Sequence, residues 1–222
     1  KEVFYHLESL EVNKGDWVWF HVASLGEFEQ ARPLINQYKL VFPMHKILLT
    51  FFSSSGYEIE KKFDAADCIC YLPWDTIKNV NQFLDFCNIH RAIFIKYEFW
   101  LNFFNGLSKR KIPIYLVSSI FRPNQLFFKN YGKAYREILF FVKHFFVQND
   151  ESKKLLNSIG IDQVSVYGDT RLDRVYNLTQ NQDRLETIER FLNGQECFVA
   201  GSTWPEDYDL MDTFLKKTCP IK

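Results

Sequence analysis

The alternation of short apolar runs with longer amphipathic segments is the feature of this 222-residue chain that most limits its fold. Runs of β-branched and aromatic residues recur up to Gly168, and helix-like segments separate them. This rhythm is typical of βαβ units, in which helices cover both faces of a parallel sheet, so we expect an α/β fold. The expected strands are 17–21, 46–51, 68–72, 91–95, 114–118, 144–147 and 164–167, and the expected helices are 27–38, 56–63, 77–86, 99–109, 127–138 and 150–159.

The pattern changes after Gly168. Segment 177–190 is polar and helix-prone, and no new strand signal appears before 197–201. That run is followed by a polar turn and by Pro205, which is typical of the first turn of a helix. One strand and one helix cannot enclose a core. We therefore expect a first domain over 1–175, a linker over 176–195 and the start of a second, truncated domain over 196–222.

Composition excludes several classes of function. Lysine plus arginine and aspartate plus glutamate both number 27, so no global field draws the chain onto nucleic acid, and any basic function is local. The five cysteines are an odd number without a C-x-x-C pair, which favours buried thiols in a reducing, cytoplasmic setting. No apolar stretch approaches the roughly 18 to 20 residues that span a bilayer, and no signal-peptide pattern opens the chain.

Polar and small side chains follow most of the expected strands, where parallel sheets gather their ligand-binding loops at one crevice. The set contains hydroxyls, carboxylates and glycines, but no Cys/His metal cluster, P-loop or G-x-G-x-x-G fingerprint. It gives no reason to expect a metal ion or a cofactor. The candidate residues are Ser24, Gly26, Glu27, Ser54, Ser55, Gly56, Glu98, Arg122 and Gln148.

Glu27 is the first candidate for a catalytic base. It ends the motif His21-Val-Ala-Ser-Leu-Gly-Glu27, which joins an expected strand to an expected helix, and such a turn is where open α/β sheets place their chemistry. A glutamate in the first turn of a helix also complements the helix dipole, and position alone leaves both roles open. We interpret His21, in the same motif, as a structural residue at the strand end.

Two further segments suit either a binding role or a structural one. Ser53-Ser-Ser-Gly56 can present hydroxyl and backbone N–H groups to a phosphate or a sugar, or it can act as an ordinary N-cap. Glu98 follows a strand among aromatic residues. That setting suits sugar stacking or an acid with a perturbed pKa, and it equally suits a helix cap beside core rings.

A basic stripe is expected on the predicted helix over 127–138. Lys129, Lys133 and Arg136 recur there at helical spacing, with aromatic residues between them. Such a face can dock on anionic lipid headgroups, or it can be a solvated face whose aromatic residues turn to the core.

Seven short motifs occur in one order along the chain. They are His21-Val-Ala-Ser-Leu-Gly-Glu27, Thr50-Phe-Phe-Ser-Ser-Ser-Gly56, Tyr71-Leu-Pro-Trp-Asp75, Glu98-Phe-Trp100, Lys109-Arg-Lys-Ile-Pro113, Gln148-Asn149 and Gly201-Ser-Thr203. With these motifs the chain resembles the 3-deoxy-D-manno-octulosonic acid (Kdo) transferase family of lipopolysaccharide synthesis, from about Trp17 to Asp207. Each motif alone has low specificity, and their shared order carries the resemblance.

The resemblance implies a GT-B glycosyltransferase, built from two Rossmann-like domains with a cleft between them. It implies an inverting transfer of Kdo from CMP-Kdo to the lipid A precursor (lipid IVA), without an essential metal ion, at the cytoplasmic face of the inner membrane. The acceptor would bind the N-terminal domain and the donor mainly the C-terminal one, where Ser202 and Thr203 are substrate-binding candidates. By the same resemblance Glu27 is the general base, Glu98 is the second catalytic carboxylate, and the basic stripe meets lipid A phosphates or the membrane.

The chain departs from the family pattern at one strand end. Many members carry Asn-Ala-Arg there, whereas this sequence reads Ser118-Ser119-Ile120, and the nearest arginine is displaced to Arg122. The family's membrane anchor and most of its donor-binding domain are not in this chain, so we expect a fragment that is inactive alone. Two alternatives stay open: another GT-B transferase of cell-envelope sugars with a different nucleotide donor, and a non-catalytic flavodoxin-like binding module.

Overall fold

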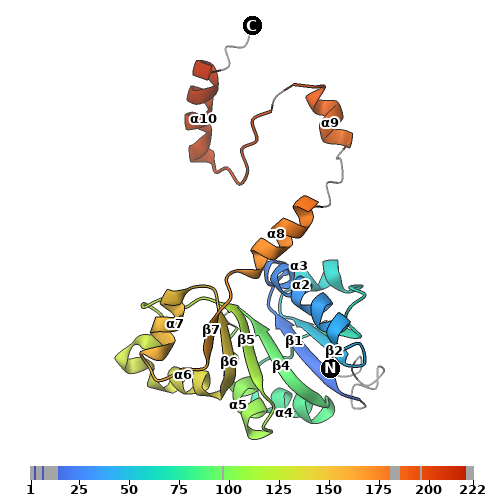
Figure 1. Ribbon diagram of the computed structural model, residues 1–222, viewed down its shortest axis with the longest axis vertical. Helices are drawn as coiled ribbons and strands as arrows, with labels where there is room; N and C mark the ends of the chain where they lie inside the picture. Colours follow the sequence, from blue (N-terminus) through green and yellow to red (C-terminus); the bar gives the residue numbers. More distant parts are fainter. Residues whose placement is uncertain are drawn as a thin grey trace. The chain divides into compact units, whose positions relative to one another are not determined.

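The computed structural model of the protein describes residues 3, 7, 15–96, 98–180, 186–195 and 197–218. The chain divides into two compact units, Lys1–Gln180 and Asn181–Lys222. The first unit holds a seven-stranded sheet and the helices that cover it (Figure 1). Among the described residues, no helix is both long enough and apolar enough to cross a lipid bilayer.

The strands of the sheet are all parallel and lie in the order β3-β2-β1-β4-β5-β6-β7 (Figure 1). Every residue of the central strand β1 is buried, because a strand of this kind of sheet is covered on both faces. The strands form where β-branched and aromatic residues concentrate. Their bounds are β1 Trp17–Val22, β2 Lys46–Phe51, β3 Cys68–Tyr71, β4 Ile89–Ile95, β5 Ile114–Ser119, β6 Val142–Val147 and β7 Val164–Val166.

Helices cover both faces of this sheet, as expected for an α/β fold (Figure 1). One face packs against Phe28, Ala31 and Ile35 of α2, and the other packs against α4, α5 and α7. Apolar residues three or four positions apart give α2, α4 and α5 a buried stripe each. The helices of this unit are α2 Leu25–Val41, α3 Ser54–Glu60, α4 Ile77–Phe86, α5 Leu101–Lys109, α6 Lys133–Glu137, α7 Asp150–Asn157 and α8 Thr170–Gln180, and three short 3-10 turns are Leu126–Phe128, Asn130–Gly132 and Ile138–Phe141.

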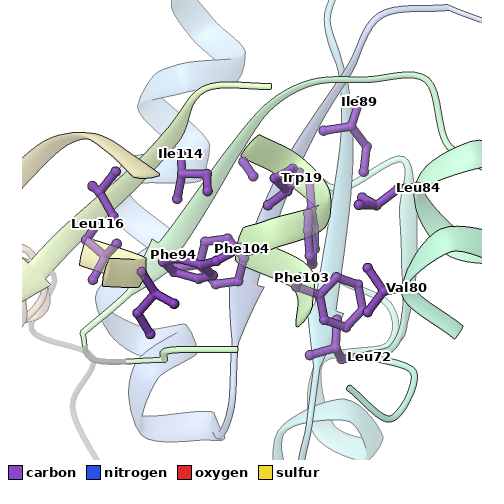
Figure 2. Packing of buried hydrophobic residues seen from close by; sticks show 14 of the residues in the cluster. Trp19, Leu72, Val80, Leu84, Ile89, Phe94, Phe103, Phe104, Ile114 and Leu116 are labelled. Carbon is purple, nitrogen blue, oxygen red and sulfur yellow. The ribbon is translucent and has the colours of Figure 1, made fainter. Parts of the chain in front are cut away.

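An aromatic cluster lies in the core on the α4 and α5 side of the sheet (Figure 2). The centroid of the Trp19 ring lies 5.1 to 5.4 Å from those of Phe83, Phe94 and Phe103. Tilted and edge-on aromatic pairs of this kind contribute about 0.5 to 1.5 kcal/mol each beyond the burial of their area. The cluster therefore stabilises β1 and β4 directly beneath the strand ends where the polar candidates lie.

The segment that follows β5 does not form the continuous helix predicted over 127–138, so that prediction was wrong. The chain forms 3-10 turns there, with α6 as a single short helix between them. A Cβ on Gly132 would overlap the carbonyl oxygen of Leu126, so the chain folds back more tightly than a helix allows. The apolar and basic spacing of this segment does not reveal that fold-back.

The Arg136 side chain stabilises this segment from within. Its guanidinium donates hydrogen bonds to the carbonyl oxygens of Phe127 at 2.7 Å and of Lys129 at 3.0 Å. The Phe127 carbonyl thereby gains a partner that a regular helix would supply through its own backbone, and the Lys129 carbonyl, which also accepts the Gly132 N–H at 3.0 Å, gains a second one. As a consequence, Lys129, Lys133 and Arg136 do not form a stripe along one helix, and the Arg136 guanidinium is engaged with the backbone.

The second unit contains the helices α9 Glu186–Leu192 and α10 Pro205–Thr218. The proline begins α10, as its fixed φ angle favours. The strand expected over 197–201 was wrong: those residues are exposed and irregular, and the described part of this unit offers no strand for them to pair with. Helix α8 runs through the predicted domain boundary at residue 175. Residues 181–185 of the expected linker, and residue 196 after it, lie outside the described residues.

Candidate active site

The order of the strands reverses at β1, because β2 and β3 lie on one side of it and β4 to β7 lie on the other. Open parallel sheets bind ligands at such a switch point, outside the carboxyl ends of the flanking strands. Here those strands are β1 and β4, which pair directly. Glu27 follows β1 and Glu98 follows β4, so the topology brings the two candidate carboxylates to the same end of neighbouring strands.

The Glu27 side chain is buried and turns back toward the loop that precedes α2. Its Oε2 accepts hydrogen bonds from the backbone N–H groups of Ala23 at 2.7 Å and Ser24 at 3.0 Å, and from the Ser24 hydroxyl at 3.3 Å. With Ser24 at the N-cap of α2 and Glu27 two residues after the first helical residue, this is the glutamate half of a capping box. Glu27 therefore has a structural role at the helix start, and all three donors bind the same one of its two oxygens.

Glu98 is a carboxyl group with a strongly shifted pKa. Its pKa is raised from 4.5 to about 7, first because burial disfavours the charged form and second because of the Glu27 carboxylate, while Trp100 and Lys96 act in the opposite direction. Lys96, at the end of β4, has a φ of 65°, a conformation that residues other than glycine adopt rarely and that is frequent near functional sites. A carboxyl group with this pKa can accept or release a proton near neutral pH.

His21 is fully buried near the end of β1. Its ring contacts strand β2 and the residue that precedes α5. Its Nδ1 lies 2.8 Å from the hydroxyl oxygen of Thr50 in β2, and its Nε2 accepts the indole N–H of Trp100 at 3.1 Å. The Thr50 oxygen also accepts the indole N–H of Trp19 at 2.8 Å. The sequence indicated that His21 is structural but missed these partners, because strand pairing brings them together from distant positions.

Three aromatic side chains, which we call the aromatic wall, lie together at the carboxyl ends of β2, β3 and β4. Phe52 is the central member, with its ring centroid 4.8 Å from Trp100 and 5.7 Å from Trp74. Phe52 and Trp74 are exposed, and Trp74 keeps 71% of its surface accessible. Exposed rings beside convergent polar groups are typical of ligand-binding surfaces.

Asp75 determines where α5 begins. Its carboxylate accepts the backbone N–H groups of Asn102 at 3.1 Å and Phe103 at 3.0 Å, and its carbonyl oxygen accepts the Asn102 side-chain amide at 2.6 Å. The first N–H groups of a helix have no partner within it, so this carboxylate acts as a cap supplied by another loop. The Tyr71-Leu-Pro-Trp-Asp75 motif contained the residue, but the spacing gave no sign of the cap.

The serine loop after β2 packs against the loop after β1. The Ser53 backbone N–H donates to the carbonyl oxygen of Ala23 at 2.7 Å, and the hydroxyl oxygens of Ser53 and Ser55 lie 2.9 Å apart. Ser54 and Ser55 are exposed at the start of α3. Their role in binding substrate stays a prediction.

Gly56 is required where α3 approaches β2 and α2. A Cβ at this position would lie 2.5 Å from Cδ1 of Phe51 and 3.0 Å from the backbone nitrogen of Leu25. Gly56 thus has a packing reason to be a glycine, independent of any ligand. At Gly26, by contrast, a Cβ would meet only the Ser24 hydroxyl, at 3.9 Å, so packing does not require a glycine there.

The candidates after β5 and β6 form a second group. The Gln148 amide donates to the carbonyl oxygen of Ser118 at 2.9 Å. Ser118 itself has a φ of 55°. The buried Ser119 hydroxyl has no hydrogen-bond partner in the described structure. Arg122 is exposed and lines a cavity of about 560 Å³ together with Lys154. No hydrogen bond or ion pair joins this arginine to either carboxylate within the described part of the chain.

Ser202 and Thr203 belong to the second unit, where Ser202 has a φ of 58°. Their role in binding substrate stays a prediction about that unit. Across residues 15–96, 98–180, 186–195 and 197–218, no group of three or more His, Cys, Asp or Glu side chains could hold a metal ion.

The first unit is one Rossmann-like half of a GT-B fold, as its parallel sheet, its covered faces and its switch point define. The solved UDP-N-acetylglucosamine 2-epimerase from Rickettsia bellii has the same architecture, with a TM-score of 0.59 at 13% identity over 79% of this chain and 52% of that one. The UDP-GlcNAc 2-epimerase from Neisseria meningitidis gives a TM-score of 0.56 at 16% identity over 81% of this chain and 53% of that one. Identities this low show the fold alone.

The family model described as 3-deoxy-D-manno-octulosonic-acid transferase (kdotransferase) matches residues 1–174, and the chain belongs to this family. The 3-deoxy-D-manno-octulosonic acid transferase of Aquifex aeolicus is 34% identical over 120 residues, which are 53% of this chain and 33% of that protein. The one from Rickettsia felis is 27% identical over 203 residues, which are 90% of this chain and 43% of that protein. The resemblance found in the sequence is confirmed, and the chain spans less than half the length of these relatives.

Proposed function

We propose that this chain is the acceptor-binding part of an inverting glycosyltransferase that moves Kdo from CMP-Kdo to the lipid A precursor (lipid IVA). The observation that carries the proposal is the placement of Glu27 and Glu98 after two paired strands, at the switch point of the sheet. The chain that forms this sheet belongs to the Kdo transferase family. CMP-Kdo binds mainly to the second domain in this proposal. The chain by itself is then inactive.

Glu27 is the general base of the proposed reaction. A hydroxyl group of the acceptor attacks the anomeric carbon of Kdo, the bond from that carbon to the CMP phosphate oxygen breaks, and the hydroxyl proton passes to the Glu27 carboxylate. Attack from the face opposite the leaving group inverts the anomeric centre. Ala23 and Ser24 hold Oε2 of the carboxylate, so its orientation is set and Oε1 can face the acceptor.

Glu98 is the second carboxyl group of the proposed site. Its pKa of about 7 means that a large share of this group is protonated near neutral pH. A protonated carboxyl group donates a hydrogen bond to the acceptor without placing a second negative charge beside Glu27. The two glutamates thereby take different roles, one as the ionised base and the other as a donor that orients the acceptor.

The aromatic wall provides a face for a sugar ring of the acceptor. Phe52, Trp74 and Trp100 present ring surfaces, of which Trp100 lies next to Glu98, and sugar rings combine an apolar face with hydroxyl groups at their edge. A ring that stacks on this wall would direct its edge hydroxyl toward the carboxylates. The leaving phosphate can be neutralised by cationic side chains or backbone N–H groups, so the proposed mechanism requires neither a metal ion nor another cofactor.

We place the enzyme at the cytoplasmic face of the inner membrane, where its acceptor is embedded. The surface that supports this placement, here called the basic-aromatic surface, contains the exposed Lys133 and the partly buried Lys129 beside exposed Tyr131, Tyr135 and Phe140. Aromatic and basic side chains together suit the headgroup region of an anionic bilayer.

A transfer assay with the full-length protein, CMP-Kdo and a tetra-acylated lipid A precursor tests this function. Glu27→Gln keeps the size of the side chain and removes the base, so we expect kcat to fall at least about 100-fold. Glu58→Gln, on the exposed side of α3, is the matched control and should transfer like the wild type. Equal transfer by Glu27→Gln would contradict the base. A wild-type protein that transfers only from another nucleotide sugar, or from none, would contradict the proposed donor.

A further inference from the structure

The hydrogen bonds of His21 identify its protonation state. An indole N–H can only donate, so the 3.1 Å contact from Trp100 Nε1 makes His21 Nε2 an acceptor that carries no proton. The ring is neutral, because burial lowers the pKa of His21 to about 3. The single ring proton is therefore on Nδ1, which donates to the Thr50 hydroxyl oxygen at 2.8 Å.

The pairing of β1 with β2 fixes the position of the His21 ring. His21 and Thr50 are register partners in the pairing of β1 with β2. The Thr50 oxygen accepts a second hydrogen bond from Trp19, whose ring is packed in the aromatic cluster of the core. Rotation of the His21 ring would leave buried polar groups without partners. Its Nε2 is therefore presented to Trp100 in one orientation.

The indole N–H of Trp100 has two acceptors in its neighbourhood. One is His21 Nε2, and the other is the Glu98 carboxyl group, which also interacts with the Trp100 side chain and whose Oε2 lies 3.9 Å from His21 Nε2. A single N–H cannot donate fully to both. We propose that His21 is a positioning residue: its unprotonated Nε2 accepts the Trp100 indole N–H and leaves the Glu98 carboxylate only a partial share of this donor.

The consequence concerns the charge of Glu98. The other groups that face it are Glu27 from the start of α2, Lys96 at the end of β4, and His21, which is neutral. An indole N–H donated in full would stabilise the ionised carboxylate. Because His21 shares this donor, the carboxyl group can keep a proton near neutral pH. The link to catalysis rests on the proposed function, whereas the sharing of the donor does not.

The experiment is an NMR titration of the Glu98 carboxyl carbon in the full-length protein labelled with 13C-glutamate, with the resonance assigned by its loss in Glu98→Gln. In His21→Leu the Trp100 N–H turns to Glu98, so the titration midpoint shifts to lower pH. In Trp100→Phe the donor is absent, so the midpoint shifts to higher pH. His21→Gln, whose amide can donate to Thr50 and accept from Trp100, keeps the wild-type midpoint, and so does the control Trp74→Phe.

Opposite shifts in His21→Leu and Trp100→Phe support the proposal, since general damage to the site has no reason to move Glu98 in two directions. Shifts in the same direction, or no shift in either variant, would overturn it. If His21→Leu does not fold, the 15N chemical shifts of the wild-type His21 ring decide: a protonated Nδ1 supports the proposal, and a protonated Nε2 overturns it. Neither measurement needs a substrate, so failure of the proposed transfer would leave this result readable.

Discussion

Asp75 and Phe103 are joined by a hydrogen bond of 3.0 Å, from the Phe103 backbone N–H to Oδ1 of the aspartate, although 28 positions separate them in sequence. The other oxygen of this carboxylate accepts the N–H of Asn102, so the loop after β3 holds the start of α5. Trp100 directly precedes this helix and contacts His21. The Asp75 cap, which is not one of the two candidate carboxylates, thereby helps to place the Trp100 ring beside Glu98.

We expect Asp75→Ala to lower the free energy of unfolding by about 1 to 2 kcal/mol, because two helix N–H groups lose their acceptor. The transfer activity should fall as well, since Trp100 loses its support. Urea unfolding followed by circular dichroism measures the first effect. Asp64→Ala, at an exposed position, should change stability little. Unchanged stability in Asp75→Ala would show that the cap contributes nothing.

Stability should depend on pH through Glu98. Because its pKa is raised from 4.5 in the unfolded chain to about 7, the folded protein binds more protons between these values, and the stability from this group is lost as pH rises through 7. A difference of this size corresponds to about 3 kcal/mol. Glu98→Gln should therefore be more stable than the wild type at pH 8, with the difference shrinking toward pH 5.

Denaturant unfolding of both proteins at pH 5 and pH 8 checks this prediction. Glu137→Gln, an exposed glutamate on α6, provides the control and should follow the wild type at both values. A Glu98→Gln variant that is less stable than the wild type at pH 8 would mean that the carboxylate is favourably paired there.

Two glycines of the candidate site should respond differently to alanine. Gly56→Ala forces a Cβ against Phe51 and the Leu25 backbone, so we expect a loss of about 1 to 3 kcal/mol in stability. Gly26→Ala should keep the stability, because only the Ser24 hydroxyl is near, and should lower transfer if the acceptor approaches this turn. Gly201→Ala is the matched control for stability alone, since a Cβ there meets nothing within 4 Å. Thermal unfolding and the transfer assay together separate packing from substrate contact.

Binding to anionic vesicles should separate the three basic residues once expected to act together. Lys133→Glu should weaken binding at least about fivefold without lowering Tm, because each basic side chain near such a surface contributes about 1 kcal/mol. Arg136→Glu should instead lower Tm, because its guanidinium bonds to backbone carbonyl oxygens. Co-sedimentation with phosphatidylglycerol vesicles measures the binding, with Lys62→Glu and neutral vesicles as controls. Equal binding by Lys133→Glu would remove the basic-aromatic surface from the docking site.

The seven strands of the sheet were predictable because each is a mostly apolar run bounded by polar turns, and each of their predicted ends lies within two residues of the observed one. The meeting of Glu27 with Glu98 was predictable for a related reason. Parallel strands deliver the residues that follow them to one edge, whatever the details of their order. The prediction of a helix over 127–138 was wrong. The residue spacing there matches a helix, but the fold-back at Gly132 and the backbone contacts of Arg136 depend on tertiary structure, which the spacing does not show.

The partners of His21 could not be predicted from the sequence. Thr50 lies 29 positions away and Trp100 lies 79 positions away, and each becomes a neighbour only when β1 pairs with β2 and β4. Burial then determines the charge of the ring, and burial is a property of the assembled core. The cap at Asp75 escaped prediction in the same way, because a cap is recognised by spacing only when it lies next to its own helix.

The direct pairing of β1 with β4 has a consequence for how this part of the protein could be reused. The residues that precede Glu27 and Glu98 are aligned by backbone hydrogen bonds, with His21 opposite Phe94, and this alignment does not depend on residues 181–222. The sheet thus places the ends of the two strands that lead to the carboxylates. Under the proposed function such a half is a module: joined to a different donor-binding half, it would offer the same acceptor hydroxyl to a new nucleotide sugar.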